Sequence, residues 1–318
     1  MCTTRGGYTA ACCGFPYAGA VLECVANVSE GRDMEKLRAL ALACGDALID
    51  VHADADHNRS VFTLAGPGAL EAVEGVKGLA VAVAHWITIV GHTGEHPSFG
   101  ALDVVPFVAL GGTNAERAQA AHEARTFASW WSQAYAVPTF LYDDADRENR
   151  DLPHVRTHAF KSRKPDFGPE EPHPILGATA VGARRPLIAV NCVLVSRDVA
   201  DARRIARMIR EASPGGLRGV RALGFYLPDV RRAQVSMNLV DIDRTGIQDA
   251  CLHARQLAKK AGTDIASVEL VGLIPRRELD RCSDDFLQWS RIDATSTIEA
   301  RIGHGPRWWP GDPDPEPI

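Results

Sequence analysis

The sequence of 318 residues lacks the signatures of disulfide-stapled, membrane-spanning and nucleotide-binding proteins. Its eight cysteines include no C-x-x-C pair and follow no regular spacing, so we expect free thiols of a cytosolic protein. No stretch reaches the roughly 18 uninterrupted apolar residues that a membrane-spanning helix requires. The glycines form neither a P-loop nor a G-x-G-x-x-G fingerprint after a strand, which gives no support for a nucleotide cofactor.

The sequence also lacks a strong charge of either sign. Its formal net charge of -5 creates no field that would attract nucleic acid or an acidic membrane. The stretch 1–19 carries Arg5 as its one charge and contains no long apolar run, so we expect no secretory signal. These absences predict a cytoplasmic protein whose partners are small molecules and further copies of the same chain, with no nucleic acid and no membrane among them.

What the sequence does contain is enough apolar residues for a large folded body. Hydrophobic residues make up 46% of the chain, and strand-like and helix-like runs alternate from Val21 to Tyr142. From 143 to 177 the alternation gives way to charge, proline and glycine, and it resumes at Leu187. Such alternation is typical of α/β proteins, and the interruption predicts two units joined by a functional connection.

We place the boundary between the two units at Gly177. The predicted divisions are a disordered N-terminal tail 1–19, an N-terminal subdomain 20–177, a C-terminal subdomain 178–304 and a flexible tail 305–318. The last tail is rich in proline, glycine and acidic residues but also contains Trp308 and Trp309. Paired indoles suggest that this tail docks on the body or on another subunit, and an unpaired tail is the alternative.

The segment 92–100 holds the densest cluster of chemically active side chains. His92, Glu95 and His96 place two imidazoles and a carboxylate within five residues, so the segment can exchange protons near neutral pH. The same letters fit the H-x-x-E-H pattern of a zinc hydrolase, but a glycine between the ligands and a proline after them disfavour the required helix. A loop whose histidines bond only backbone groups is the structural alternative, and the clustering favours a site.

Four further clusters place polar residues and glycines at the ends of apolar runs, where α/β proteins usually carry their sites. They span 23–32, 50–60, 165–169 and 234–239. Together with 92–100 and 177–184, their order along the chain resembles the formimidoyltransferase family, whose best known members are glutamate formimidoyltransferases of histidine breakdown. The resemblance runs from Val21 to Leu279 and so includes both units and the connection.

The resemblance implies a fold and a reaction. The fold is α/β (α+β), with two ferredoxin-like subdomains whose sheets face each other across a substrate groove, and family members are commonly homodimers. The reaction moves a formimidoyl group from N-formimidoyl-L-glutamate, or a related N-formimidoyl amino acid, to N5 of the co-substrate tetrahydrofolate, and it needs no metal. The chain would then be a transferase of one-carbon and histidine metabolism, without the cyclodeaminase domain that is fused to it in animals.

The catalytic histidine of the family falls on His96, within the matching Gly94-Glu95-His96-Pro97. When N5 attacks the formimidoyl carbon it must lose a proton, the departing amine must gain one, and a single imidazole can perform both transfers. Glu95 could hold the tautomer of His96 or stabilise the positively charged amidine. Alternatively, Glu95 only caps neighbouring backbone groups.

The resemblance also indicates which residues contact the substrates. The predicted substrate-binding residues are Asn27, His52, Asp54, Asn58, Arg59, Arg184, Gln234 and Asn238, and the predicted folate-binding residues are Gly168, Pro169, Pro174 and Gly177. Arg59 and Arg184 suit carboxylates because a guanidinium binds a carboxylate through two hydrogen bonds, although surface ion pairing is the alternative for each. The histidines and aspartates of 52–57 could instead hold a metal; we favour substrate contacts because the family reaction needs none.

Ala26 and Val28 replace a proline and a phenylalanine of the family pattern, and three further departures each remove a polar or charged residue. Ser98 replaces an arginine, Gly91 a basic residue and Val193 an asparagine, so three polar contacts are lost. A lost arginine removes a two-point partner for a carboxylate, so the donor could differ from formimidoylglutamate. Three alternatives therefore stand beside the main prediction: a transferase with a changed donor or acceptor, a zinc hydrolase that uses His92 and His96, and a folate-binding protein without catalysis.

Overall fold

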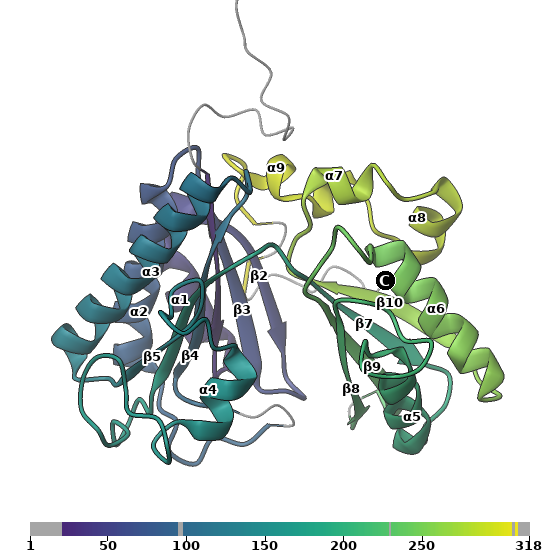
Figure 1. Ribbon diagram of the computed structural model, residues 1–318, viewed down its shortest axis with the longest axis horizontal. Helices are drawn as coiled ribbons and strands as arrows, with labels where there is room; N and C mark the ends of the chain where they lie inside the picture. The colour runs from purple at the N-terminus through teal and green to yellow at the C-terminus, as the bar shows by residue number, and fades with distance from the viewer. Residues whose placement is uncertain (1–20, 95–97, 229, 307–308, 311–318) are drawn as a thin grey trace, which may run out of the picture.

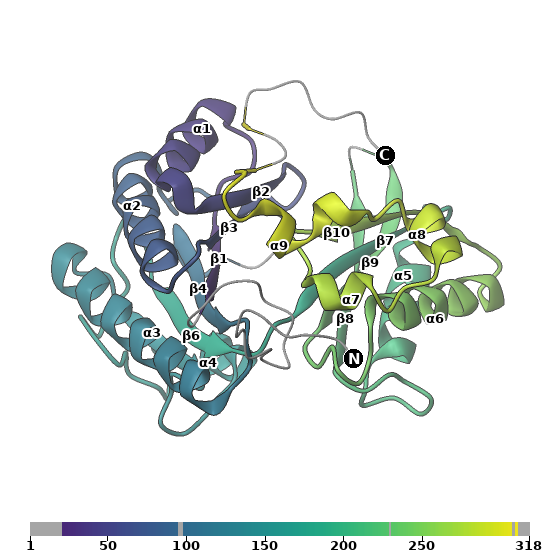
Figure 2. The same ribbon diagram turned by 90° about the horizontal axis from the view of Figure 1, so that it is seen from above.

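The computed structural model describes residues 21–94, 98–228, 230–306 and 309–310 (Figure 1). Glu95, His96, Trp308, the tail 1–19 and the residues from 311 onward lie outside this part of the chain. The described residues form two subdomains, each a β-sheet with helices on its outer side, and the inner sides of the sheets face one another (Figures 1 and 2). This arrangement confirms the predicted α/β fold with two subdomains.

The first subdomain is built on a six-stranded mixed sheet with the strand order β2-β3-β1-β4-β6-β5. The strands are β1 (Leu22–Val28), β2 (Leu48–Asp54), β3 (Arg59–Ala65), β4 (Leu102–Ala109), β5 (Thr139–Asp143) and β6 (Thr179–Arg184). Strand β6 pairs in parallel with β4 and β5, and the other pairs are antiparallel. The helices are α1 (Met34–Ala43), α2 (Leu70–Trp86) and α3 (Asn114–Tyr135) on the outer side, the short η1 (Gly45–Ala47), and α4 (Leu152–His158) on the inner side.

The connection between the subdomains returns to the first sheet before it leaves. Strand β6 follows the predicted boundary at Gly177, yet it lies between β4 and β5 of the first sheet. The chain therefore changes sheets between Arg184 and Ile188. Gly177 itself has a φ of 70° and touches the backbone of Gly100, where a Cβ would collide, so glycine is required there.

The second subdomain is a four-stranded antiparallel sheet with the order β10-β7-β9-β8. Its strands are β7 (Ile188–Leu194), β8 (Val220–Leu227), β9 (Arg232–Leu239) and β10 (Ile265–Val271). Helices α5 (Val199–Ile209) and α6 (Ile247–Lys260) cover its outer side. After β10 come α7 (Arg276–Leu279), α8 (Asp284–Ser290), η2 (Ala294–Ser296) and α9 (Ile298–Arg301).

Alternation along the strands decides what faces the space between the sheets. Successive side chains of a strand point to opposite faces. In β9, Ala233, Val235 and Met237 join the core beneath α5 and α6, so Gln234 and Asn238 point to the inner side. Gln234 and Asn238 therefore face the first subdomain, and each outer layer of helices covers an apolar core of its own.

Contacts at the upper end of the molecule join the two subdomains. Leu273 and Ile298, from the segment after β10, pack with Val21 and Ile49 of the first subdomain. Trp309 packs against the core of the first subdomain. Within the described ranges, no helix is long and apolar enough to cross a membrane.

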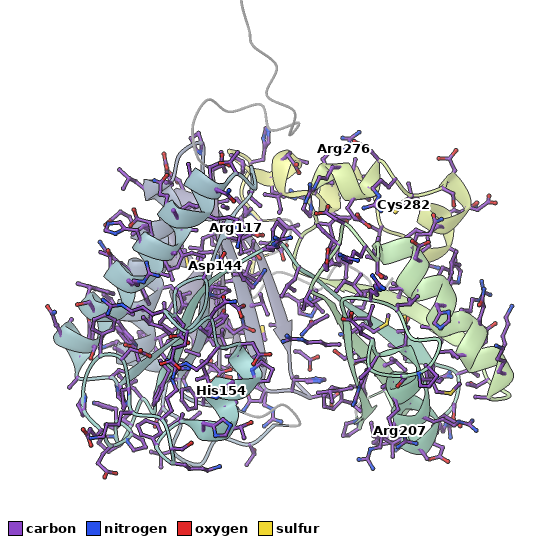
Figure 3. The ribbon with its side chains drawn as sticks, viewed as in Figure 1. Arg117, Asp144, His154, Arg207, Arg276 and Cys282 are labelled. Atoms are coloured by element: carbon purple, nitrogen blue, oxygen red, sulfur yellow. The ribbon has the colours of Figure 1, made fainter. Side chains whose placement is uncertain are left out.

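An ion pair links the outer helices of the first subdomain to the end of its sheet. Arg117 of α3 donates to the carboxylate of Asp144, which follows β5, over 2.8 Å (Figure 3). In the same view Arg207 and Arg276 lie on the opposite subdomain, on α5 and α7, away from the first sheet. Arg117 therefore ties α3 to the segment that follows β5.

Candidate functional site

The segment 92–94 is held against the turn between β2 and β3. The side-chain nitrogen of Asn58 donates to the carbonyl of Thr93 over 3.0 Å. Asn58 has a φ of 46°, a conformation that asparagine tolerates better than most residues. A Cβ on Gly94 would collide with the carbonyl oxygen of His57, so only glycine permits this approach. Residues of two predicted motifs therefore lie side by side here.

Asp103, near the start of β4, is a fully buried carboxylate with three protein donors. Its Oδ2 accepts from the guanidinium groups of Arg59 and Arg156, each over 2.6 Å, and its Oδ1 accepts from the backbone N–H of Phe99 over 2.6 Å. Arg59 also donates to Oδ1 of Asn27, over 2.9 and 3.1 Å. Arg59, which we expected to bind a substrate carboxylate, is thus already paired with a carboxylate of the protein.

The stretch from Gly100 to Ala101 is fixed by two neighbours from distant parts of the chain. The hydroxyl of Ser29 donates to the carbonyl of Gly100 over 2.7 Å, and its backbone N–H donates to Ala101 over 2.9 Å. On the other side, Gly100 pairs with Gly177, and the N–H of Ala101 donates to Leu176 over 2.9 Å. The end of the connection, with the predicted folate residue Gly177, therefore lies beside this segment.

Polar contacts from β2 and its turn cross to the second subdomain. Nε2 of His52 lies 3.5 Å from Oε1 of Glu269 on β10, and Oε2 of Glu269 accepts from Asn191 on β7 over 3.0 Å. Five residues after His52 in the chain, the ring of His57 meets the ring of Phe225 on β8 edge to face, with 5.0 Å between centroids. The two subdomains thus meet at the predicted motif 50–60.

His57 and Asp54 form an ion pair whose members shift each other's pKa. Nδ1 of His57 and Oδ2 of Asp54 are 3.0 Å apart. Burial alone would lower the pKa of His57, but the hydrogen bond and charge of Asp54, with the charges of Asp56 and Glu269, raise it. Burial alone would raise the pKa of Asp54, but hydrogen bonds from the side chain and backbone of His57 lower it. Each member of the pair therefore favours the charged form of the other.

The ion pair predicts a pH dependence of stability. A histidine pKa that is higher in the folded state adds stability. This stability is fully present below the pKa of the unfolded state, about 6.5, and is lost as pH rises through the pKa of the folded state. The lowered pKa of Asp54 adds stability that is fully present above the pKa of aspartate in the unfolded state, about 3.9. This stability is lost as pH falls through the lower pKa of the folded state. Replacing His57 with glutamine should therefore flatten the fall in unfolding free energy as pH rises above about 6.5. Urea denaturation across this pH range measures the free energy of unfolding. The control variant is His122→Gln, because His122 is exposed. Equal curves of unfolding free energy against pH for His57→Gln and wild type would refute the pairing.

The pKa of His92 shifts in the opposite direction to that of His57. Burial, opposed in part by the charge of Glu30, lowers the pKa of His92. Nδ1 of His92 lies 3.4 Å from the side-chain nitrogen of Asn58. The histidine at the start of the segment is therefore neutral near pH 7.

The remaining predicted residues are spread over a wider area. Arg184 is level with Glu23 in the strand register, at the opposite end of the sheet from Arg59. Burial, opposed by Arg184 and reinforced by Glu299, raises the pKa of Glu23 to about 7. The structure therefore does not bring the two predicted carboxylate-binding arginines together.

The predicted folate residues also divide into two groups. Gly168 has a φ of 92° and lies against Ser132 and Pro138, so it packs beside the connection between α3 and β5. Pro169 follows it on the surface, and Pro174 is likewise exposed. Of the four residues, Gly177 makes the direct backbone pairing with the segment that ends at Gly100.

The sequence predicts two metal sites as alternatives, one in 52–57 and one with His92 and His96. In the described part of the chain, no three His, Cys, Asp or Glu side chains are grouped so that they could hold a metal. His52 pairs with Glu269, and His57 pairs with Asp54, so the residues of 52–57 do not converge on one point. The alternative with His92 and His96 involves a residue outside the described ranges.

Sequence reasoning missed three residues of this site. The motifs do not include Asp103, but it is the one charged residue in the apolar run 101–110, and a charge in such a run signals a buried group that must have partners. Glu269 and Phe225 carry no such signal, because an acidic or aromatic residue in a half-buried strand is ordinary. Their contacts with His52 and His57 arise only when the two subdomains come together.

Comparison with known proteins identifies relatives of the whole described body. The formiminotransferase domain, N-terminal subdomain, matches residues 21–184, and the formiminotransferase domain matches residues 189–301. A glutamate formimidoyltransferase of Streptococcus pyogenes serotype M1 is 32% identical over 288 residues, which cover 86% of this chain and 95% of the relative. One of Thermoplasma acidophilum is 34% identical over 300 residues, which cover 89% and 97%.

A longer relative matches in part. The formimidoyltransferase-cyclodeaminase of Mus musculus is 35% identical over 279 residues, which cover 81% of this chain and 51% of that relative, so the chain spans about half its length. Both domain matches follow one another in the same order as the two sheets. The chain therefore belongs to the formiminotransferase family of transferases.

Proposed function

We propose that the protein transfers a formimidoyl group from N-formimidoyl-L-glutamate, or a related N-formimidoyl amino acid, to N5 of tetrahydrofolate. The observation that carries this proposal is the match of both subdomains to the formiminotransferase domain, over 21–184 and 189–301. The relatives from Streptococcus pyogenes and Thermoplasma acidophilum, matched over nearly their whole length, are named glutamate formimidoyltransferases. The closeness of Asn58, Arg59 and Gly177 to the segment 92–101 supports the same function.

In this proposal His96 is the general acid and base. N5 attacks the formimidoyl carbon, the N5–C bond forms, and a tetrahedral adduct results. His96 accepts the proton that N5 loses and donates a proton to the glutamate nitrogen, after which the C–N bond to glutamate breaks and glutamate leaves. Glu95 would hold the tautomer of His96 or stabilise the amidinium. Bonds from Asn58 to Thr93 and from Phe99 to Asp103 support this role because they fix the chain on both sides.

The inner faces supply contacts for the two substrates in this scheme. Arg184 forms no ion pair with any described residue, so its guanidinium suits a substrate carboxylate. His52, Asp54 and Asn238 face the space between the sheets and would contact the substrates as predicted. The four glycines and prolines between 168 and 177 would bind the folate. A homodimer and a cytoplasmic location remain predictions.

One observation favours a changed donor as the second candidate function. Ser98 stands where the family carries an arginine, and Arg59 is committed to Asp103 and Asn27. The glutamate carboxylates therefore have fewer arginine partners near the segment 92–101 than the family pattern provides. A donor with another amino-acid part would depend less on them.

The test measures the transferred group directly. Purified protein is incubated with tetrahydrofolate and either formimidoylglutamate or another N-formimidoyl amino acid, and acidification converts the product to the absorbing 5,10-methenyl form. Product with formimidoylglutamate supports the first function, and product with the other donor alone supports the second. No product with either donor at saturation contradicts both. A hydrolytic activity that a chelator abolishes and that added zinc restores would instead support the alternative of a zinc hydrolase.

A further inference from the structure

Arg32 is an exposed arginine whose terminal nitrogens bond to no described residue. It lies between β1 and α1, and its Nε donates to the carbonyl of Ala55 over 2.8 Å. The acids beside it are engaged elsewhere: Glu30 accepts from the backbone N–H groups of Arg32 and Asp33, and Asp33 caps the start of α1. The guanidinium of Arg32 is therefore held at one edge, and its other edge forms no ion pair with a described residue.

The backbone just before Arg32 is fixed to the turn that also holds the segment 92–94. Oδ1 of Asn58 accepts from the N–H of Gly31 over 3.1 Å, and the side-chain nitrogen of Asn58 donates to the carbonyl of Thr93 over 3.0 Å. A Cβ on Gly31 would collide with the carbonyl oxygen of Asp54, so only glycine permits this approach. Asn58 therefore places Arg32 beside the segment 92–94.

The charge of Arg32 acts on His92, the first residue of that segment. Burial is the largest cause of the lowered pKa of His92, and of the two arginines that lower it further, Arg32 acts more strongly than Arg59. Coulomb interactions weaken with separation, so Arg32 is a near neighbour of His92. Arg59 is paired with Asp103 over 2.6 Å. Of these two arginines, Arg32 is therefore the one whose charge is available to an anionic ligand.

We propose that the free edge of the Arg32 guanidinium binds a substrate carboxylate and so supplies, from a different element, the contact that Ser98 cannot make. This inference rests on the proposed function and names a residue that selects its substrates. With Nε engaged, the two terminal nitrogens of an arginine still present parallel donors that match the two oxygens of a carboxylate. In the proposed reaction two molecules carry such a group: the donor, in its glutamate part, and tetrahydrofolate, in its glutamyl tail.

Replacing Arg32 with glutamine removes the charge and the paired donors. The affinity for the substrate whose carboxylate lies there should fall by about tenfold to a hundredfold. KM for that substrate should rise while kcat stays near wild type, because Arg32 would contact a carboxylate and not the reacting carbon. The urea midpoint should change little, since the side chain is exposed. Equilibrium binding of formimidoylglutamate and of tetrahydrofolate under argon, each measured alone, shows which substrate is affected.

Three controls separate a specific contact from a general effect of charge. Arg38→Gln removes the same charge from an exposed arginine of α1 and should leave both affinities unchanged. Arg32→Lys keeps the charge but loses the planar pair of donors, so it should recover part of the lost affinity. Tetrahydropteroate, which is tetrahydrofolate without its glutamate, reports whether a loss for the folate depends on the glutamyl carboxylates.

The outcomes are distinct. A loss for formimidoylglutamate alone places a donor carboxylate at Arg32, and a loss for tetrahydrofolate that tetrahydropteroate does not share places the glutamyl tail there; either supports the inference. Unchanged affinity for both substrates, or an equal loss in Arg38→Gln, overturns it. A wild type that binds both substrates without turnover contradicts the proposed transfer but leaves this test valid. A wild type that transfers the formimidoyl group, with Arg32→Gln binding both substrates equally well, overturns this inference alone.

Discussion

Replacing His96 with glutamine should lower kcat for formimidoyl transfer by about 10²–10⁴-fold, while both substrates still bind. Glutamine can form hydrogen bonds, but unlike imidazole it cannot accept and release a proton near neutral pH. The measurement is the rate of methenyl product after acidification, with KM determined for tetrahydrofolate and for the donor. KM values close to wild type would show that the loss lies in proton transfer.

Two histidines serve as comparisons for this variant. His122→Gln changes an exposed residue of α3 and should leave kcat unchanged. His92→Gln tests the other histidine of the segment, which burial keeps neutral near pH 7. Wild-type kcat in His96→Gln contradicts the assignment, and a large loss in His92→Gln alone would transfer the role of base to His92. A non-catalytic folate-binding protein would show no turnover in any of them.

Replacing Asp103 with asparagine should lower the free energy of unfolding by about 3–5 kcal/mol. Burial alone would raise the pKa of Asp103, but the charges of Arg59 and Arg156 and the hydrogen bonds from Arg59 and Phe99 lower it, so the residue is ionised. Asparagine leaves two guanidinium groups without their shared counter-charge. Urea denaturation at neutral pH measures the change. The lowered pKa of Asp103 adds stability that is lost as pH falls. The difference in unfolding free energy between Asp103→Asn and wild type should therefore shrink in acid.

The chain offers a matched control for the effect on activity. Asp146 is also a buried carboxylate, and it pairs with Arg150 over 2.6 Å. Burial alone would raise its pKa, but hydrogen bonds from Arg150 lower it to about 2, so Asp146→Asn should also destabilise the fold. Only Asp103 holds Phe99, and with it the chain just after His96. At temperatures where both variants are folded, kcat should therefore fall in Asp103→Asn and remain near wild type in Asp146→Asn; equal values would reduce Asp103 to a structural role.

Much of the fold could be predicted from the sequence because its signals are local. Apolar alternation in runs such as 187–195 predicts strands, and the lapse from 143 to 177 predicts a connection. The exact place where the chain leaves the first sheet could not be predicted. Strand β6 is a short apolar run after the connection, and its pairing with β4 and β5 depends on the three-dimensional sheet.

The site was predictable to a smaller extent. Motif resemblance found Asn58 and Arg59, which do lie at the segment 92–101, but it assigned Arg59 to a substrate without its partner Asp103. Contacts such as His52 with Glu269 join residues from different subdomains, and no local pattern specifies how the subdomains dock. The roles of His96 and Glu95 remain predictions, because both residues lie outside the described ranges.

The position of strand β6 has a consequence for the order in which the protein can form during synthesis. Strands β4 and β5 are made early, but they do not touch; the strand that fills the gap between them comes only after the whole connection. Until Arg184 has left the ribosome, both would present open edges, which are prone to pairing with other chains. A fragment that stops at Gly177 would keep this gap permanently. The smallest portion of the chain that can close its own sheet therefore ends after Arg184.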